Sequence, residues 1–501
     1  MARPVATQTS EEGGEHGGSP ATPARRHWLA CLLLTAGLVL RVLAQLAYQP
    51  ALIYVDTAKY LYGAYPGSDP LGYKLSLKVT LLFSDLGTVT AVQHLLGLAM
   101  AVALYALLLR RGISRWLAAV AMAPVLLDAY QLQMEHTIMP DVWFEALLVA
   151  GLVFLLWRPV VTVPFAVAAG VLLGASATMW QTGELLVLPV VLFLLAAGGG
   201  WRRAIGRSAV LTAAFVLPIL CYCTVSYAST GHFWLSRGQG SIGRVTAAAD
   251  CATLRVPADV RRLCPTRAAQ ARGPDWLEHS GQSPLYTTPV PRGTSRKALL
   301  SQLSSAIKHQ QPLRVAAAIA RDSVRVLALT RDPVESVTPI SRWQFQTSYP
   351  TYPPWVGLRH GTIMIGLQPG FRAFHFVPLS RSYGGRARVS RPLASFLRAY
   401  QLHGGYTPGP LYAVTCLLGL AGSLLVAFRR RPGPRAHQAA LACLLFTGCA
   451  AVVLLVPDVF EFSWRYELSA EIVLPAAGVL GLSALLNWRR DRSAAAGRLV
   501  T

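Results

Sequence analysis

The sequence predicts an all-α polytopic membrane protein with about ten membrane-spanning helices. Hydrophobic residues make up 53% of the 501 residues, charged residues make up only 14%, and the mean hydropathy is +0.41. Soluble domains carry more charge, about 25% of their residues. Apolar stretches of roughly 20 residues, enough to cross a hydrocarbon core, recur toward both ends of the chain. Between them lies a long polar stretch, for which we expect a large mixed or irregular segment outside the membrane, between the seventh and eighth helices.

The first apolar stretch follows Arg25 and Arg26 and has no small-residue cleavage site, so we expect a retained anchor and not a signal peptide. The Gly-rich, acidic residues before it predict a disordered cytoplasmic tail over residues 1–27. The expected spans are residues 28–47, 88–109, 116–132, 141–157, 162–179, 185–198, 208–229, 409–428, 437–456 and 467–487.

Clusters of arginine lie in every second connection between these spans. Such clusters are typical of cytoplasmic connections. We therefore expect a multi-pass protein of the plasma membrane with both termini in the cytoplasm. The domains that follow are an N-terminal transmembrane module over residues 28–229 with an outer loop at 48–87, an extracytoplasmic domain over 230–408, C-terminal spans over 409–487 and a cytoplasmic tail over 488–501.

The formal net charge is +23, which raises the question of nucleic-acid binding. The basic residues fall mainly at the cytoplasmic flanks and in the outer segment, and no basic recognition module is visible, so nucleic acid is not an expected partner. The basic outer segment instead predicts an anionic partner, such as a lipid phosphate or a wall polymer.

Two of the eight cysteines, Cys251 and Cys264, lie in the outer segment, separated by the twelve residues ATLRVPADVRRL. The extracytoplasmic side is oxidising, so we expect a disulfide between them, the alternative being two free thiols. No CxxC motif or paired histidine accompanies them, which argues against zinc. The other six lie in expected spans as small packing residues.

Candidate chemistry lies at the outer membrane surface. Asp56 follows the first span closely, and Glu135, His136 and Asp141 crowd a short connection near the same surface. Charged groups near hydrocarbon cost free energy and are retained for pairing or function. We therefore expect Asp56 and the connection with Glu135, His136 and Asp141 to lie close together in the folded protein. The alternatives are a solvated cap for Asp56, helix N-terminal stabilisation for Asp141 and an interface residue for His136.

Two arginines are unusual in position. Arg41 lies about 20 Å along the first span, where it either binds the phosphate of a lipid carrier or pairs with a neighbouring helix through a residue such as Glu184. Arg465 stands beside Tyr466 at the outer start of the last span, where an anionic headgroup would account for it.

Taken together, these elements resemble the GT-C glycosyltransferases that use polyprenyl-phosphate sugars, the group of protein O-mannosyltransferases and lipid A aminoarabinose transferases. The resemblance rests on Arg41 in the first span and on four sequence elements: YVDTAKY around Asp56, DPLGYKLSL with Tyr73 and Lys78, EHTIMPD, and the closing RYELSAEIVLP.

The resemblance implies an inverting sugar transfer from a polyprenyl-phosphate donor to a glycan, lipid or protein acceptor. It makes Asp56 the general base, with Asp141 and Glu135 as further catalytic residues. The implied substrate- and carrier-binding residues are Arg41, Tyr73, Lys78, His136, Arg465 and Tyr466.

The sequence also departs from the family pattern. Thr57 follows Asp56 where the family often has a second acid, and the sequence MWQTGE stands where an arginine is frequent. The use of a divalent metal, Mg²⁺ or Mn²⁺, is therefore left open, and no other cofactor is predicted. The alternative functions are a transporter or flippase of lipid-linked sugars and a non-enzymatic envelope assembly protein.

Overall fold

The computed structural model describes residues 26–497 except 64–69, 198–199, 237–240, 332, 334–337, 368–374 and 428–432. Most of the N-terminal stretch expected to be disordered, residues 1–25, lies outside the described part. The described chain is mostly helical, as predicted.

Six helices in the described part of the chain are long and apolar enough to cross a membrane. A seventh span is present if α6 (Arg115–Leu127) and α7 (Ala129–Glu135), which meet at a 55° bend, are taken as one. The protein is thus a multi-pass membrane protein. The six helices are α2 (Trp28–Ala47), α5 (Leu86–Arg110), α11 (Trp201–Thr230), α20 (Gly409–Ala427), α21 (Pro434–Asp458) and α22 (Leu468–Gly497).

The described part of the chain has six or seven helices long enough to count as candidate spans, where the sequence predicted about ten. Three of the expected spans form helices shorter than the roughly 20 residues that cross a bilayer. These are α8 (Asp141–Leu156, 16 residues), α9 (Val163–Met179, 17 residues) and α10 (Val187–Ala196, 10 residues), the last preceded by the 3₁₀ helix η1 (Gln181–Leu186). Most of α8 is buried inside the bundle.

Small residues let neighbouring helices approach closely. Gly174 of α9 faces the backbone of α11 at Phe215, and a side-chain Cβ at this position would collide with the Phe215 carbonyl oxygen. Helix interfaces in membranes depend on such close contact, because the apolar lipid provides no hydrophobic driving force between helices. The α9–α11 and α21–α22 pairs are the most extensive in the bundle.

A helical lobe lies beyond one end of the bundle. It contains α12 (Ile242–Ala248), α15 (Gly273–His279), α17 (Arg296–Gln310) and α18 (Pro312–Ser323). The lobe has its own small apolar core, which includes Leu303 and Ile307. The predicted disulfide is confirmed, with the Cα atoms of Cys251 and Cys264 separated by 5.9 Å.

Two small sheets make the chain less purely helical than expected. The antiparallel strands β2 (Val356–Arg359), β3 (Thr362–Leu367) and β4 (His375–Pro378) form the mixed part of the expected outer segment. The second sheet pairs β1 (Tyr48–Gln49) with β5 (Arg388–Val389). The helix that follows β5, α19 (Arg391–Leu402), packs against α2. The end of the first span is thereby fixed to a segment more than three hundred residues later.

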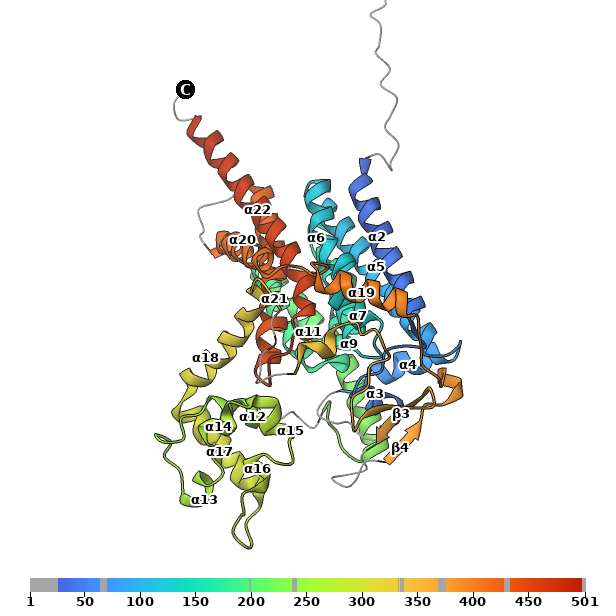
Figure 1. Ribbon diagram of the computed structural model, residues 1–501. Coiled ribbons are helices and arrows are strands. Elements are labelled where there is room, and N and C mark those ends of the chain that lie inside the picture. Colours follow the sequence, from blue (N-terminus) through green and yellow to red (C-terminus); the bar gives the residue numbers. More distant parts are fainter. Residues whose placement is uncertain are drawn as a thin grey trace, which may run out of the picture.

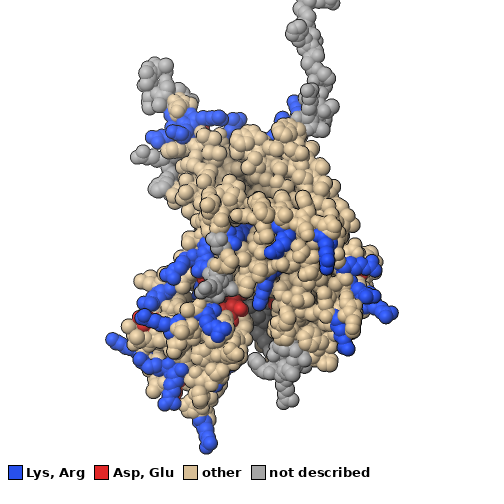
Figure 2. Space-filling model, in the orientation of Figure 1, with Lys and Arg blue, Asp and Glu red and all other residues tan. Residues whose placement is uncertain are grey.

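The described ends of the chain lie at one end of the bundle, and the helical lobe and the β2–β4 sheet lie at the other (Figure 1). We call the second end the cavity end. On the face shown in Figure 2, lysine and arginine side chains gather near the chain ends and over the cavity end, and a band almost free of charge separates them. This distribution suits a bilayer around the band.

Candidate functional site

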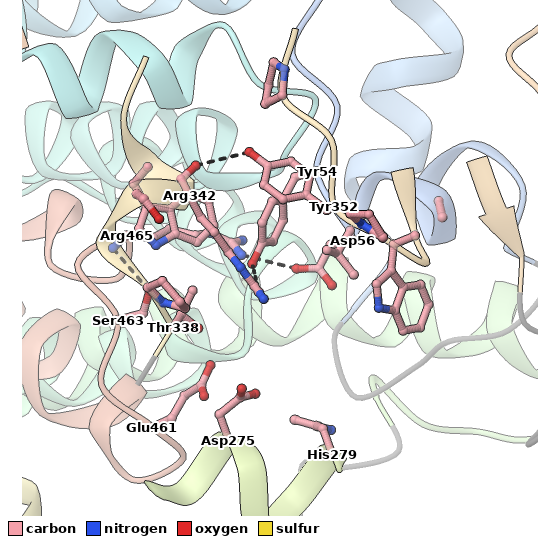
Figure 3. A pocket seen from close by; sticks show the side chains of 18 of the residues that line it. Tyr54, Asp56, Asp275, His279, Thr338, Arg342, Tyr352, Glu461, Ser463 and Arg465 are labelled. Atoms are coloured by element: carbon pink, nitrogen blue, oxygen red, sulfur yellow. Dashed lines mark hydrogen bonds and ion pairs between the residues drawn. The ribbon is translucent and has the colours of Figure 1, made fainter. Parts of the chain in front are cut away.

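A cavity of about 1380 Å³ opens at the cavity end, between the bundle, the helical lobe and the segment 338–355. Charged side chains and aromatic rings line it together, which is typical of a site for a polar organic ligand. Figure 3 shows how side chains from distant parts of the chain converge there. The residues with most chemical interest are Tyr54, Asp56, Lys59, Trp180, Asp275, His279, Arg342, Trp343, Tyr352, Glu461, Arg465 and Tyr466.

Arg465 links the two acids that the sequence predicted to converge. Its Nε and Nη2 atoms donate to the two carboxylate oxygens of Asp141, at 2.7 and 2.9 Å. Its Nη1 atom donates to Asp56 Oδ2 at 3.3 Å. Arg465 lines the cavity and Asp141 is buried against it, so the three charged groups form one unit at the cavity wall. We refer to these three residues as the Arg465 unit.

Backbone contacts hold this unit together. Asp56 directly precedes α3 (Thr57–Leu61), and the Thr57 hydroxyl donates to the Ile138 carbonyl at 3.0 Å. Leu52 also bridges to the 136–138 backbone, with hydrogen bonds in both directions. Because Asp141 begins α8 only three residues after Ile138, these bonds place the first outer loop beside the start of α8.

Asp56 is ionised at neutral pH. Burial raises the pKa of its carboxyl, but the charges of Lys59 and Arg465 outweigh that effect, and the net pKa lies below its ordinary value. Lys59 Nζ lies 3.3 Å from Asp56 Oδ1. About a third of the Asp56 side chain is exposed to the cavity (34%), so a ligand can reach the carboxylate.

A second pair of acids, Asp275 and Glu461, faces the same cavity. Asp275 comes from α15 and Glu461 from the connection between α21 and α22, and they point toward each other in Figure 3. Burial, together with the neighbouring carboxylates of Asp275 and Asp56, raises the pKa of Glu461 to about 8. Glu461 therefore carries a proton at neutral pH, and Tyr466 donates a hydrogen bond to it at 3.3 Å.

Sequence reasoning did not identify Asp275, Glu461 or Arg342. Glu461 stands four residues before Arg465 in PDVFEFSWRYELS, which was the one available signal for it. Asp275 and Arg342 lie within residues 230–408, whose sequence offered no signal for either of them. Only the folded arrangement brings them to the cavity.

Aromatic rings form much of the cavity wall. The Tyr54 ring lies 4.6 Å from that of Trp343 and 5.4 Å from that of Tyr352, measured between ring centres. Across the cavity the Trp180 ring lies 5.4 Å from the Tyr466 ring. Such rings offer large rigid faces at little entropic cost when a ligand binds.

Arg41, Glu135 and His136 do not line this cavity. Arg41 Nη2 donates to Glu135 Oε1 at 2.6 Å, and His94 connects Glu135 to His136 through hydrogen bonds of 2.9 and 3.0 Å. All four side chains are buried, and Arg41 also donates to the carbonyl groups of Val125 and Leu126.

The interpretation of Arg41 as a carrier-phosphate ligand does not fit this arrangement, because its guanidinium is enclosed within the protein. The alternative, an ion pair with a neighbouring helix, is present, but the partner is Glu135 and not Glu184. Glu135 and His136 are buried in the same network and do not line the cavity, so their expected catalytic and binding roles stay predictions.

Two other predicted carrier-binding residues also lie away from the cavity lining. Tyr73 is buried at the start of α4 (Tyr73–Leu81), where its hydroxyl donates to Gln93 at 2.7 Å. Lys78 is exposed on the same helix. Of the six residues expected to bind substrate or carrier, Arg465 and Tyr466 line the cavity.

The residues present do not fit a divalent metal. Within the described ranges, no group of three or more His, Cys, Asp or Glu side chains is arranged to hold a metal ion. Asp56 and Asp141 are both hydrogen-bonded to the guanidinium of Arg465.

Comparisons with known proteins give matches at the level of structure. No protein-family model matches the sequence, and no curated protein matches it either. The archaeal oligosaccharyltransferase AglB from Archaeoglobus fulgidus, in complex with an inhibitory peptide and a dolichol-phosphate, is 12% identical with a TM-score of 0.39, over 92% of this chain and 51% of that one. This chain therefore spans about half the length of AglB.

Two further solved structures are similar. ArnT from Cupriavidus metallidurans bound to undecaprenyl phosphate is 14% identical with a TM-score of 0.34, over 91% of this chain and 78% of that one. The S. cerevisiae protein O-mannosyltransferase Pmt1–Pmt2 complex bound to the sugar donor is 14% identical with a TM-score of 0.33, over 46% of this chain and 37% of that one. The matches to AglB and to ArnT each cover more than nine tenths of this chain.

Proposed function

We propose that the protein transfers a sugar from a polyprenyl-phosphate carrier to an acceptor hydroxyl group within the 1380 Å³ cavity. The observation that carries this proposal is the Arg465 unit, in which one guanidinium binds both Asp56 and Asp141 at the cavity wall. It puts an accessible carboxylate and a fixed positive charge side by side. Transfer of a sugar from a phosphate needs both, one to accept a proton and one to stabilise the leaving anion.

The proposed reaction is a single displacement with inversion at the anomeric carbon. The acceptor oxygen attacks this carbon, the bond between the carbon and the phosphate oxygen breaks, and the polyprenyl phosphate leaves with the bonding electrons. Asp56 takes the proton of the acceptor hydroxyl. A positioned proton acceptor contributes about 10² to 10⁴ in rate.

Arg465 and Arg342 are the proposed partners of the leaving phosphate. Arg342 lines the cavity and donates to the Tyr54 hydroxyl at 3.3 Å, which fixes its direction. Guanidinium groups suit phosphate oxygens because their N–H groups form paired, charge-assisted hydrogen bonds. In this proposal Arg342 replaces Arg41, whose guanidinium is enclosed in the bundle.

We further propose that the cavity end lies on the outer side of the plasma membrane and that both termini are cytoplasmic, as the arginine clusters predict. The carrier would then reach the cavity from the bilayer, and the glycan, lipid or protein acceptor from outside. The outer orientation also suits the Cys251–Cys264 disulfide, since disulfides persist in oxidising compartments.

The test is incubation of the purified protein, in lipid nanodiscs, with radiolabelled polyprenyl-phosphate sugars and a membrane extract. The proposal predicts label in an acceptor and release of an equal amount of polyprenyl phosphate. Proteoliposomes distinguish the alternatives. Movement of intact labelled donor across the bilayer without cleavage would support a flippase, and binding without either event would support an assembly protein.

A further inference from the structure

Arg465 occupies the space between two carboxylates that need a shared cation. Its bonds to Asp141 measure 2.7 and 2.9 Å and its bond to Asp56 measures 3.3 Å. Asp141 is buried, with 3% of its surface exposed, and Arg465 is buried as well, with 7% exposed. Two ionised carboxylates beside each other repel, and a positive charge between them offsets this repulsion.

Proteins supply such a charge either as a divalent metal or as a basic side chain. Mg²⁺ binds oxygen ligands at about 2.0 to 2.1 Å in octahedral geometry and keeps several waters. A guanidinium has five N–H donors in a planar fork and stays protonated. Both oxygens of Asp141 accept a hydrogen bond from this fork.

The local charges balance without a metal. Asp56 and Asp141 contribute two negative charges, which the guanidinium of Arg465 and the ammonium of Lys59, 3.3 Å from Asp56, neutralise. The nearby Glu461 adds no charge at neutral pH, because its pKa is raised to about 8. Asp275 and Arg342, which line the same cavity, are an acid and a base and offset each other, so a divalent cation would add an excess of positive charge beside Arg465.

Aromatic rings fix the position of the guanidinium. Arg465 Cζ lies 5.6 Å from the centre of the Tyr466 ring and 5.7 Å from that of the Trp343 ring, within the range of cation–π attraction. The Arg465 backbone N–H also donates to the Ser463 hydroxyl at 3.4 Å. The arginine is thus part of the built wall of the cavity.

We propose that Arg465 takes the place of a divalent cation between Asp56 and Asp141, so that this site works without a metal. The inference rests on the proposed sugar transfer for its functional meaning. Mn²⁺ binding at Asp56 and Asp141 can be measured without a sugar donor or acceptor. The proposed metal-free site and the proposed sugar transfer can therefore fail independently of each other.

The experiment is a Mn²⁺ titration of the purified, chelator-treated protein in detergent, followed by electron paramagnetic resonance of free Mn²⁺. The wild type should bind no Mn²⁺ at Asp56 and Asp141. Arg465→Ala and Arg465→Gln should each gain one site, at least tenfold tighter than any Mn²⁺ binding in the wild type. Arg465→Lys keeps the positive charge and is the matched control, which should gain none. Adding Asp141→Asn to Arg465→Ala should remove the new site.

Two results would overturn the inference. The first is a Mn²⁺ site in the wild-type protein that disappears in Asp56→Asn or Asp141→Asn. The second is a folded Arg465→Ala or Arg465→Gln protein that binds no more Mn²⁺ than the wild type. Folding is verified by gel filtration and by thermal unfolding. If both neutral variants fail to fold, the test uses the wild-type protein alone. Mn²⁺ should then not raise the Tm of the wild type. A rise in Tm with Mn²⁺ that is lost in Asp56→Asn would contradict the inference.

Discussion

The guanidinium of Arg465 binds both carboxylate oxygens of Asp141, at 2.7 and 2.9 Å, although 324 positions separate them in sequence. The bond joins the start of α8 to the connection before α22 at the point where the cavity meets the bundle. Since the same arginine also reaches Asp56, one side chain organises acids from two outer connections. The proposed chemistry depends on this relationship.

Asp141→Asn should destabilise the protein strongly. It leaves the buried guanidinium of Arg465 without its bidentate partner, and breaking a buried ion pair costs about 3 to 5 kcal/mol. Thermal unfolding in detergent should show a clear drop in Tm. Asp259→Asn, which changes an exposed acid on the helical lobe, is the matched control and should unfold like the wild type. Equal Tm values for Asp141→Asn and Asp259→Asn would show that the Asp141–Arg465 ion pair does not stabilise the protein.

Arg41 and Glu135 should behave as a structural pair. Arg41→Gln and Glu135→Gln should each lower stability, and the double variant should lose less than the sum, because each single change leaves the other charge buried without its partner. Neither should change the KM for the donor in protein that remains folded, since neither side chain lines the cavity. A raised donor KM in Arg41→Gln, with stability unchanged, would restore its expected role in carrier binding.

The Cys251–Cys264 disulfide should stabilise the helical lobe. It closes a loop of 13 residues, for which the loss of unfolded-state entropy predicts about 3 kcal/mol. Cys251→Ala, Cys264→Ala and the double variant should therefore show the same reduction in the resistance of this lobe to limited proteolysis. Free reaction of both wild-type thiols with an alkylating reagent would disprove the bond.

Glu461 should make stability depend on pH. The pKa of a glutamate, ordinarily 4.5, is raised to about 8 at Glu461 in the folded state, so the folded protein holds a proton that the unfolded chain has lost. The stabilisation from this group is therefore complete below about pH 4.5 and is lost as the pH rises through about 8. Glu461→Gln should show a flatter dependence of Tm on pH between these values. If Tm depends on pH equally steeply in the wild type and in Glu461→Gln, the raised pKa of Glu461 is contradicted.

Local patterns in the sequence predicted several features correctly. The spacing and expected compartment of Cys251 and Cys264 predicted their disulfide. The two outer acids Asp56 and Asp141 were expected to converge, and they do so through Arg465. In each case the determining information is near in sequence or follows from membrane topology.

The features that sequence reasoning missed depend on long-range packing. Arg41 pairs with Glu135 because the chain bends by 55° between α6 and α7, and hydrophobicity alone does not predict this bend. Asp275 reaches the cavity only because the helical lobe is fixed to the bundle, as by the 2.6 Å bond from Ser323 to Asp458.

The most direct test of the central claim is the rate of sugar transfer by Asp56→Asn, compared with the wild type and with Asp259→Asn, at saturating donor and acceptor. The substitution removes a proton acceptor and changes little volume, so the variant should fold and should still bind the donor. If Asp56 accepts the proton of the acceptor hydroxyl, its transfer rate should fall by about 10² or more, while Asp259→Asn keeps the wild-type rate. Transfer by folded Asp56→Asn within a few-fold of the wild-type rate would contradict the assignment of Asp56 as the proton acceptor.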